Sequence, residues 1–246
     1  MRGQLVPVPL RGTAAAVVYA APEADSLRRL LKTLRLLPLE EIVVVLPGDS
    51  SSALLAASQS QHGVTAVYRP GLADPDVGRA LGGKLARADA VLFVDGVSRV
   101  SSESLARFLW QCDNGMDVAL NDATRQLGSF NRRPNIYRLA EFLNRTLNRR
   151  DLRASSLSVL PYALSRRALQ TIGYGSLVIP PHAHTAAILA DLRVGIAGTA
   201  PATGPTPRNQ NVDGYAHAWK MAMNRWGNRH SFPDFARNRT VMEGWT

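Results

Sequence analysis

The first 120 residues alternate short apolar runs with longer amphipathic segments, and this alternation limits the available folds more than any other feature. The short runs have the length and β-branched content of strands buried on both faces. They lie at residues 14–19, 42–46, 64–68, 90–94 and 118–120. Segments of helical spacing lie between them, at residues 25–34, 51–61, 76–87 and 102–112. Strands linked by helices predict an α/β fold, with a mainly parallel sheet flanked by helices on both faces.

The ends of two helices are also indicated. Asp25 is predicted as the N-cap of the first helix, and Ser101 or Ser102 as the cap of the fourth. After Asn121 the pattern is less regular. It predicts helices near residues 136–147, 165–172, 183–192 and 213–226, and a further segment at 155–162. We expect a domain over residues 1–200 and a C-terminal appendage over 201–246, made of a Pro, Thr and Gly-rich loop, a helix and a basic tail.

The chain is basic, with 29 Lys and Arg against 19 Asp and Glu and a formal net charge of +10. An anionic partner is therefore expected: a nucleotide diphosphate, an acidic polymer, nucleic acid or an anionic membrane surface. Many cations in the second half are arginines, whose forked guanidinium suits phosphate, although a solvated basic surface would give the same composition. Nucleic acid ranks last among the partners, because no recognition helix, zinc finger or aromatic ribonucleoprotein motif stands out.

Cysteine and hydropathy patterns bear on the compartment. Cys112 is the single cysteine, which excludes an intramolecular disulfide and a cysteine-cluster metal site. No apolar run approaches the roughly 20 residues that span a bilayer, and residues 1–11 lack the apolar core of a signal peptide. The sequence predicts a cytoplasmic protein that could contact the inner face of the membrane.

Residues that follow the strands are the first candidates for a site, because ligands of open α/β sheets bind at the carboxyl ends of strands. The first strand is followed by Ala-Ala-Pro-Glu-Ala-Asp in place of G-x-G-x-x-G, which disfavours hydride transfer. The kinase motif G-x-x-x-x-G-K-[ST] and the glycine-rich loop of sugar nucleotidyltransferases are also missing from the sequence. Glu23, Gly48 and Asp95 each follow a predicted strand, so we expect them along one edge of the sheet.

Three segments resemble family 2 glycosyltransferases, which have the GT-A, Rossmann-like nucleotide-sugar-binding fold. They are residues 17–27 (VVYAAPEADSL), 41–50 (EIVVVLPGDS) and 78–97 (GRALGGKLARADAVLFVDGV). Residues 160–169 (LPYALSRRAL) resemble the acceptor-side segment of the family. The chain departs from the family at four positions: Pro22 replaces the usual Asn, Leu46 and Pro47 replace an acidic pair, and Val97 replaces the second acid of the D-x-D motif.

The resemblance implies a role for each matching residue. Glu23 and the run Gly48, Asp49, Ser50 would border the nucleoside. Gly78 and Arg79 would lie on the diphosphate side, and Asp95 would bind a divalent cation, Mn²⁺ or Mg²⁺. The donor implied first is a UDP-sugar, and the acceptor is not identified. The alternatives are local: Asp95 could only begin a turn, and Glu23 could only stabilise the start of a helix.

Other candidates come from the second half. Asp213 begins a predicted helix at a place where an inverting transferase could present its catalytic base. A helix N-cap explains Asp213 equally well, and His217 could serve as the base instead. His182 and His184 are interpreted as surface or helix-start histidines in preference to metal ligands. The leading hypothesis is sugar transfer from a nucleotide donor. The alternative is a catalytically silent relative that binds a nucleotide or a partner as a scaffold, which the losses at Leu46, Pro47 and Val97 motivate.

Overall fold

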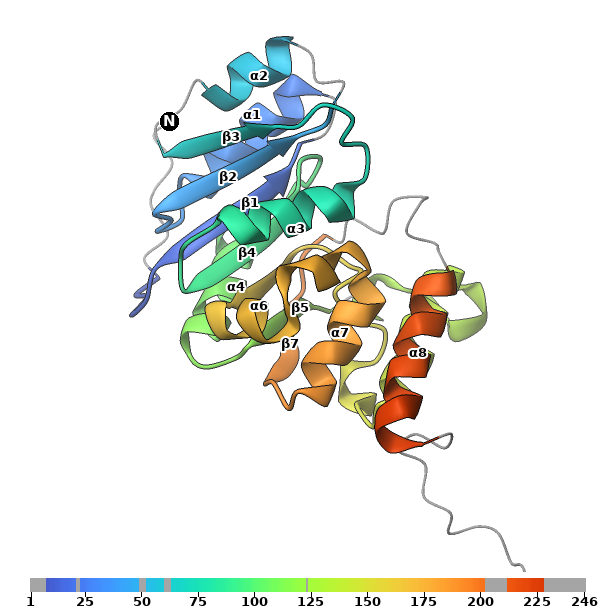
Figure 1. Ribbon diagram of the computed structural model, residues 1–246. Coiled ribbons are helices and arrows are strands. Elements are labelled where there is room, and N and C mark those ends of the chain that lie inside the picture. Colours follow the sequence, from blue (N-terminus) through green and yellow to red (C-terminus); the bar gives the residue numbers. More distant parts are fainter. Residues whose placement is uncertain are drawn as a thin grey trace, which may run out of the picture.

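The computed structural model describes residues 8–20, 23–48, 52–59, 63–122, 124–201 and 212–227. In these segments seven strands form one sheet in the order β3-β2-β1-β4-β6-β5-β7 (Figure 1). The strands are β1 (Ala14–Tyr19), β2 (Glu41–Leu46), β3 (Val64–Tyr68), β4 (Ala90–Asp95), β5 (Val118–Asn121), β6 (Tyr162–Ser165) and β7 (Val194–Gly198).

The sheet is mainly parallel, as the alternation predicts. β1 pairs in parallel with β2 and β4, β2 with β3, and β5 with β7. Only β6 is antiparallel to both of its neighbours, β4 and β5. The carboxyl ends of the other six strands of the described sheet therefore meet at one edge.

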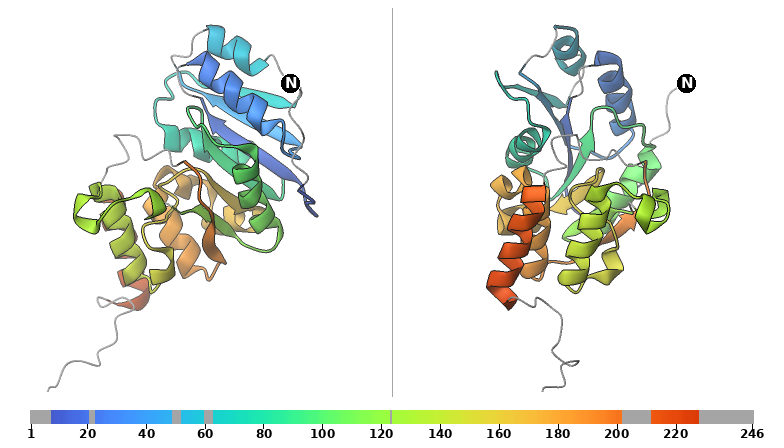
Figure 2. Two further views of the ribbon diagram at one scale, coloured as in Figure 1. Left: turned by 180° about the vertical axis from the view of Figure 1, so that it is seen from behind. Right: turned by 90° about the vertical axis from the view of Figure 1, so that its right-hand side faces the viewer.

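Helices cover both faces of the sheet (Figure 2). The α-helices are α1 (Ala24–Leu34), α2 (Ser52–Gln59), α3 (Pro75–Leu85), α4 (Ser102–Asp113), α5 (Asn135–Thr146), α6 (Arg166–Ile172), α7 (Pro180–Leu189) and α8 (Val212–Trp226). Four 3₁₀ turns accompany them: η1 (Thr124–Gln126), η2 (Phe130–Arg132), η3 (Arg150–Leu152) and η4 (Tyr174–Val178).

Two hydrophobic cores lie on opposite faces of the sheet, because side chains alternate along each strand. In β1, Ala16 and Val18 face the core that includes apolar residues of α1, α2 and α4. Ala15 and Val17 face the core that includes residues of α3 and of α5 to α8. This confirms the predicted helices on both faces.

Glycines in α3 let that helix lie very close to β1. A Cβ atom added at Gly78 would lie 2.3 Å from Cδ2 of Tyr19, and one added at Gly82 would lie 2.4 Å from Cγ1 of Val17. Such distances are far below van der Waals contact, so larger residues would force the helix away. The close approach holds the N-terminal end of α3 at the carboxyl edge of the sheet.

The C-terminal helix α8 packs on the rest of the fold. Tyr215, Ala218 and Ala222 are buried in the same core as α5 and α7, and the Tyr215 hydroxyl donates to the carbonyl of Ile136 at 3.3 Å. The division of the chain at residue 200 stays a prediction. Among the described residues, no helix is long and apolar enough to cross a bilayer.

The structure corrects one sequence-based expectation and adds detail at two other places. Glu23, not Asp25, occupies the N-cap position of α1, and Asp25 lies in the first turn. The segment 155–162 is mostly irregular and leads into β6. β7 was not predicted, since its sequence VGIAG has two glycines and little apolar bulk, and only pairing with β5 identifies it as a strand.

Candidate functional site

Three of the predicted site residues lie at the carboxyl edge of the sheet. Tyr19, the last residue of β1, is in register with Val45 of β2 and with Asp95 of β4. Glu23 follows β1 and Gly48 follows β2, so both lie at the edge where Asp95 ends its strand. This is the edge where open α/β sheets bind their ligands.

Asp95 is a half-buried carboxylate at the end of a buried strand. Its Oδ1 accepts the backbone N–H of Val97 at 3.3 Å, and its carbonyl accepts the N–H of Ser98 at 2.9 Å, so it also closes a turn. Val97, at the position of the missing second acid, is 47% exposed. No group of three or more His, Cys, Asp or Glu suited to a metal ion occurs in the described segments. One carboxylate fits a cation that takes its other ligands from phosphates and water, not a cation held by side chains alone.

Glu23 and Gly48 each have a local structural role. Oε2 of Glu23 accepts a hydrogen bond from the Ser26 hydroxyl at 3.0 Å, at the start of α1. Gly48 donates its N–H to the carbonyl of Leu72 at 2.8 Å, and a Cβ at Gly48 would lie 2.3 Å from the backbone nitrogen of Gly71. The loops after β2 and β3 thus touch at Gly48. The predicted neighbours Asp49 and Ser50 lie outside the described residues.

Arg79 lies beneath the edge, not open to it. The side chain is paired with Asp76, and the two residues are only 5% and 1% exposed. Asp74 caps α3 by accepting the N–H of Asp76 at 2.8 Å. Burial raises the pKa of Tyr162 to about 12, and the charge of Arg79 acts in the opposite direction. Arg79 is therefore an internal charge whose carboxylate partner, Asp76, reaches the surface of a pocket.

That pocket, of about 160 Å³, brings together segments that are far apart in the sequence. The N-terminal ends of α3, α7 and α8 converge on it. Its walls are Asp74, Asp76, Ser158, Val178, Ile179, Pro180, Pro181, Asp213, Gly214 and His217. The two predicted base candidates, Asp213 and His217, therefore share one cavity, which we call the three-helix pocket.

Asp213 and His217, the two base candidates, are more exposed than Asp76, the buried carboxylate of the same pocket. Asp213 lies inside the first turn of α8, with Val212 as the first helical residue, and His217 is one turn further on. Both side chains are exposed, and neither has a hydrogen bond or ion pair within the described part of the chain. Each is therefore free to meet a ligand.

The sequence did not indicate Asp74, Asp76 or Ser158 as neighbours of Asp213. Asp-Pro-Asp at residues 74–76 is readable as a helix start, with a capping carboxylate and proline in the first turn. Ser158 is buried and lies beside the Tyr215 side chain. The packing of α8 against α7, and of α3 and α7 against η4, brings these groups to Asp213.

A larger and more open hollow, of about 760 Å³, adjoins the three-helix pocket through Val178, Ile179 and His217. It also contains His182, whose pKa is lowered by burial and, to a smaller extent, by the neighbouring His217. The lowered pKa of His182 disfavours a positive charge on this wall.

His184 is neither a surface residue nor a metal ligand among the described groups, so its sequence-based interpretation was wrong in part. The side chain is fully buried in α7, and Nε2 lies 2.7 Å from Oδ1 of Asn144. The amide nitrogen of Asn144 donates to the carbonyls of Arg153 and Ser155, both at 2.9 Å. Oδ1 must therefore accept, and Nε2 of His184 donates. Burial, aided by Arg149, lowers the pKa of His184 to about 3, so the ring is neutral.

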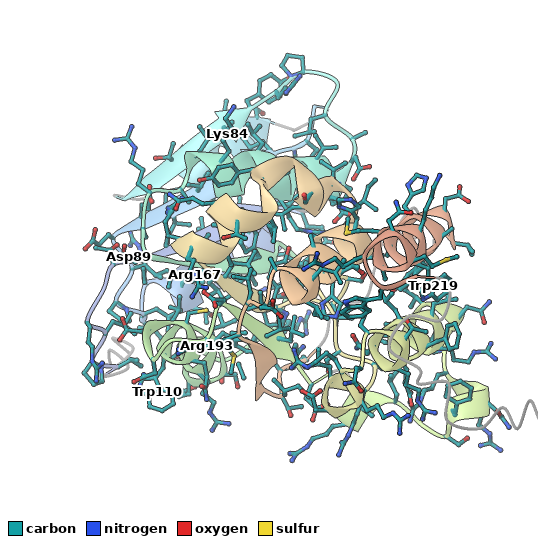
Figure 3. The ribbon with its side chains drawn as sticks, turned by 60° about the horizontal axis from the view of Figure 1, so that its bottom comes forward. Lys84, Asp89, Trp110, Arg167, Arg193 and Trp219 are labelled. Atoms are coloured by element: carbon teal, nitrogen blue, oxygen red, sulfur yellow. The ribbon has the colours of Figure 1, made fainter. Side chains whose placement is uncertain are left out.

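The opposite edge of the sheet carries carboxylates with structural roles. Asp89 accepts the N–H and the hydroxyl of Thr13 at 3.0 and 2.8 Å, which lowers its pKa. Asp117 accepts the N–H of Arg193 at 3.0 Å and lies 3.7 Å from the guanidinium of Arg167. Figure 3 shows Asp89, Arg167 and Arg193 on neighbouring segments at this edge. The contrast leaves the carboxyl edge as the candidate site.

Solved structures share this fold. Glucosyl-3-phosphoglycerate synthase from Mycobacterium tuberculosis, in complex with Mn²⁺, UDP and glucosyl-3-phosphoglycerate, matches with a TM-score of 0.53 and 17% identity, over 91% of this chain and 82% of that one. Mannosyl-3-phosphoglycerate synthase from Rubrobacter xylanophilus matches with a TM-score of 0.57 and 14% identity, over 92% and 78%. No protein-family model and no curated protein sequence matches the chain. At these identities the likeness shows the fold alone, the GT-A-type α/β fold.

Proposed function

We propose that the chain is a glycosyltransferase, which transfers a sugar from a nucleotide-diphosphate donor to an acceptor. One observation carries the proposal. The fold, whose carboxyl edge carries Asp95, matches that of a synthase over 91% of this chain, and the structure of that synthase holds UDP and Mn²⁺. We propose a UDP-sugar as the first donor to test. The net charge of +10 also supports an anionic ligand, and contact with an anionic membrane surface is a secondary proposal.

The edge residues are proposed to hold the donor. Glu23 and the run Gly48 to Ser50 would border the nucleoside, beside the loop contact of Gly48 with Gly71. Asp95 would supply one oxygen to a divalent cation, Mn²⁺ or Mg²⁺, that arrives with the diphosphate. Such a cation would neutralise the charge that develops on the leaving diphosphate.

Gly78 and Arg79 are proposed to act through positioning. Gly78 lets α3 approach Tyr19, and Arg79 balances the buried charge of Asp76. Together they hold the start of α3 next to the three-helix pocket. This refines their expected place on the diphosphate side, because the burial of Arg79 leaves its guanidinium no open path to a ligand.

Asp213 and His217 are proposed to act on the acceptor. A carboxylate or an imidazole can take the proton of an attacking hydroxyl, provided that it comes within hydrogen-bond reach. Both side chains line the three-helix pocket and have no described partner that would compete. Asp213 is the first candidate, and His217 the second.

The donor proposal is tested by a thermal-shift screen of UDP- and GDP-sugars with the purified chain, with and without Mn²⁺. A ligand that binds the native state raises the melting temperature by mass action. Asp95→Asn keeps the size and the turn preference but removes the charge, so it should abolish metal-dependent stabilisation and leave the melting temperature of the free protein almost unchanged. Asp191→Asn is the matched control: Asp191 has a φ of 54°, which Asn also tolerates, and it precedes β7 at the other edge of the sheet.

A parent protein that responds to no nucleotide, or an Asp95→Asn variant that responds like the parent, would contradict the role of Asp95. The first result would instead support the silent-scaffold alternative. Turnover of a stabilising donor in the presence of candidate acceptors would then decide whether the chain is an enzyme.

A further inference from the structure

A third cavity, of about 640 Å³, lies among η1, α5 and η3, and it shares no residue with the three-helix pocket or with the hollow beside it. We call it the arginine pocket. Its lining residues are Thr124, Arg133, Glu141, Phe142, Arg145, Arg150 and Arg153. Four arginines face one glutamate, a formal excess of three positive charges. The proposed donor site uses none of these residues.

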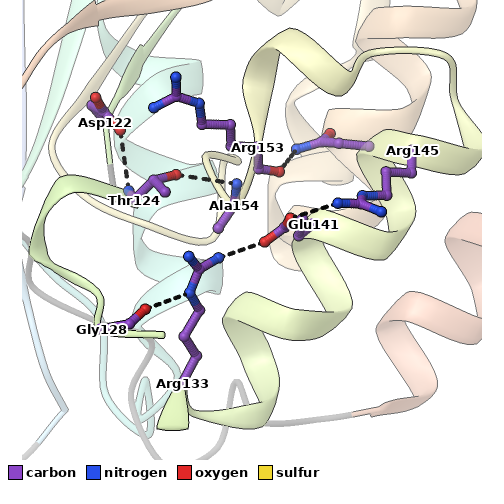
Figure 4. Close-up of polar contacts among 9 residues, drawn as sticks. Asp122, Thr124, Gly128, Arg133, Glu141, Arg145, Arg153 and Ala154 are labelled. Carbon is purple, nitrogen blue, oxygen red and sulfur yellow. Dashed lines mark hydrogen bonds and ion pairs between the residues drawn. The ribbon is translucent and has the colours of Figure 1, made fainter. Parts of the chain in front are cut away.

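Glu141 accounts for two of the arginines. Its Oε2 accepts from Nη1 of Arg133 at 2.5 Å, and its Oε1 accepts from Nη2 of Arg145 at 3.2 Å. Figure 4 shows Arg133 and Arg145 reaching Glu141 from opposite sides. The Arg133 and Glu141 side chains are each only 14% exposed, so this pair forms the floor of the cavity.

Arg150 and Arg153 have no carboxylate partner among the described residues, although both line the cavity. The nearest acid in sequence, Asp151, is paired with Arg149 at 2.8 Å. Two guanidinium groups thus lie at the cavity, and no acid of the described segments neutralises them. Guanidinium forks bind carboxylate and phosphate oxygens in pairs, with stronger hydrogen bonds than neutral donors make.

The backbone of Arg153 has a conformation that favours glycine. Arg153 has φ 50° and ψ −121°, and the N–H of Ser155 donates to the carbonyl of Leu152 at 2.9 Å. These values match the first central position of a type II′ turn, which is normally glycine. A residue with a Cβ is strained in this conformation. Glycine would remove that strain, and within the described residues the Arg153 side chain makes no hydrogen bond or ion pair that would offset it.

Buried hydrogen bonds hold the strained turn in place. Asn144 donates to the carbonyls of Arg153 and Ser155, and the neutral ring of His184 fixes the amide of Asn144 by donating to its oxygen. The hydroxyl of Thr124, from η1, accepts the N–H of Ala154 at 3.4 Å. The position of the turn is therefore set from the core, before any ligand arrives. Such preorganisation lowers the entropic cost of binding.

We propose that the arginine pocket binds a small molecule that carries a phosphate or carboxylate group, with Arg150 and Arg153 holding its oxygens. Phe142, which is 53% exposed, supplies an apolar wall for the rest of the molecule. Its ring is held by an edge contact with Trp219, with centroids 5.3 Å apart. The ligand class is thus an anionic group beside a flat or apolar one.

The test uses the full chain and isothermal titration with two probes, inorganic pyrophosphate and citrate, in low salt with EDTA to remove divalent cations. The parent should bind at least one probe. Arg150→Gln and Arg153→Gly should each weaken binding by about tenfold, since each removes a charge-assisted hydrogen bond. Arg153→Gly should also keep or raise the melting temperature, because glycine relieves the turn. If Arg153 had only a structural role, its replacement would not weaken probe binding while keeping or raising the melting temperature.

Two controls match the variants. Arg138→Gln removes a positive charge from the same helix, α5, at a residue that bonds to Asn135 and does not line the cavity. Asp95→Asn changes the proposed donor edge, and both controls should bind the probes like the parent. The preferred probe identifies the oxygens as phosphate or carboxylate.

Three results would overturn the proposal. The parent could bind neither probe, or Arg150→Gln and Arg153→Gly could bind like the parent. Equal weakening in Arg138→Gln would show that net charge alone attracts the probes. Because the titration contains no sugar nucleotide and no metal, its failure would leave the proposed transferase function to its own test.

Discussion

Two regions supply residues that the sequence predicts for the site, but the fold uses them differently. One region is made of the carboxyl ends of the strands together with α3, and the other is the first two turns of α8. Gly48 closes a contact between two loops, and Arg79 balances the buried charge of Asp76. Asp213 and His217 line the three-helix pocket, and no described residue bonds to either side chain. Gly48 and Arg79 are therefore tied to stability, while Asp213 and His217 can be altered at little cost to the fold. Residues of the second kind are the better candidates for chemistry.

The largest expected effect tests the first region. Arg79→Met removes the partner of Asp76 and leaves a carboxylate that is 1% exposed without compensation. Breaking a buried ion pair in this way costs about 3–5 kcal/mol. Urea unfolding should show that loss in the free energy of unfolding. The double variant Arg79→Met, Asp76→Asn should recover much of it, and a single variant within about 0.5 kcal/mol of the parent would show that the pair is not buried in solution.

An intermediate effect is expected at Gly48. Gly48→Ala places a Cβ 2.3 Å from the backbone nitrogen of Gly71, so one of the two loops must move. Overpacking of this kind costs about 1–3 kcal/mol. The measurement is the unfolding midpoint without any ligand. Gly128→Ala is the control, because its Cβ would meet open space. Equal midpoints for the two variants would remove the structural role of Gly48.

The smallest effect on stability is expected in the second region. Asp213→Asn and His217→Gln change exposed side chains that have no hydrogen bond or ion pair with a described residue, so each should alter the free energy of unfolding by less than about 0.5 kcal/mol. If the proposed roles hold, turnover with a stabilising donor should fall by about a hundredfold or more in one of them, while donor binding is retained. A large loss of stability in either variant would break the contrast between the two regions.

The sequence by itself determined the sheet and the helices of the first half. Apolar runs such as Ile42 to Leu46 read as buried strands because parallel strands are covered on both faces, and helical spacing between them requires crossover connections. The same reasoning places Glu23, Gly48 and Asp95 at one edge. It also predicts α8, whose buried residues recur at helical spacing.

Only the tertiary structure decided which of these residues are engaged in the fold and which are free. Gly48 meets Gly71 across two loops, Arg79 turns inward to Asp76, and His184 bonds to Asn144. The sequence near these residues does not indicate the contacts, except that Asp76 and Arg79 are three residues apart on one helix. The neighbours of Asp213 and the strained turn at Arg153 likewise depend on packing between helices. Periodicity reports which face of an element is buried, but the partner of a side chain depends on how distant elements pack, and one sequence does not carry that information.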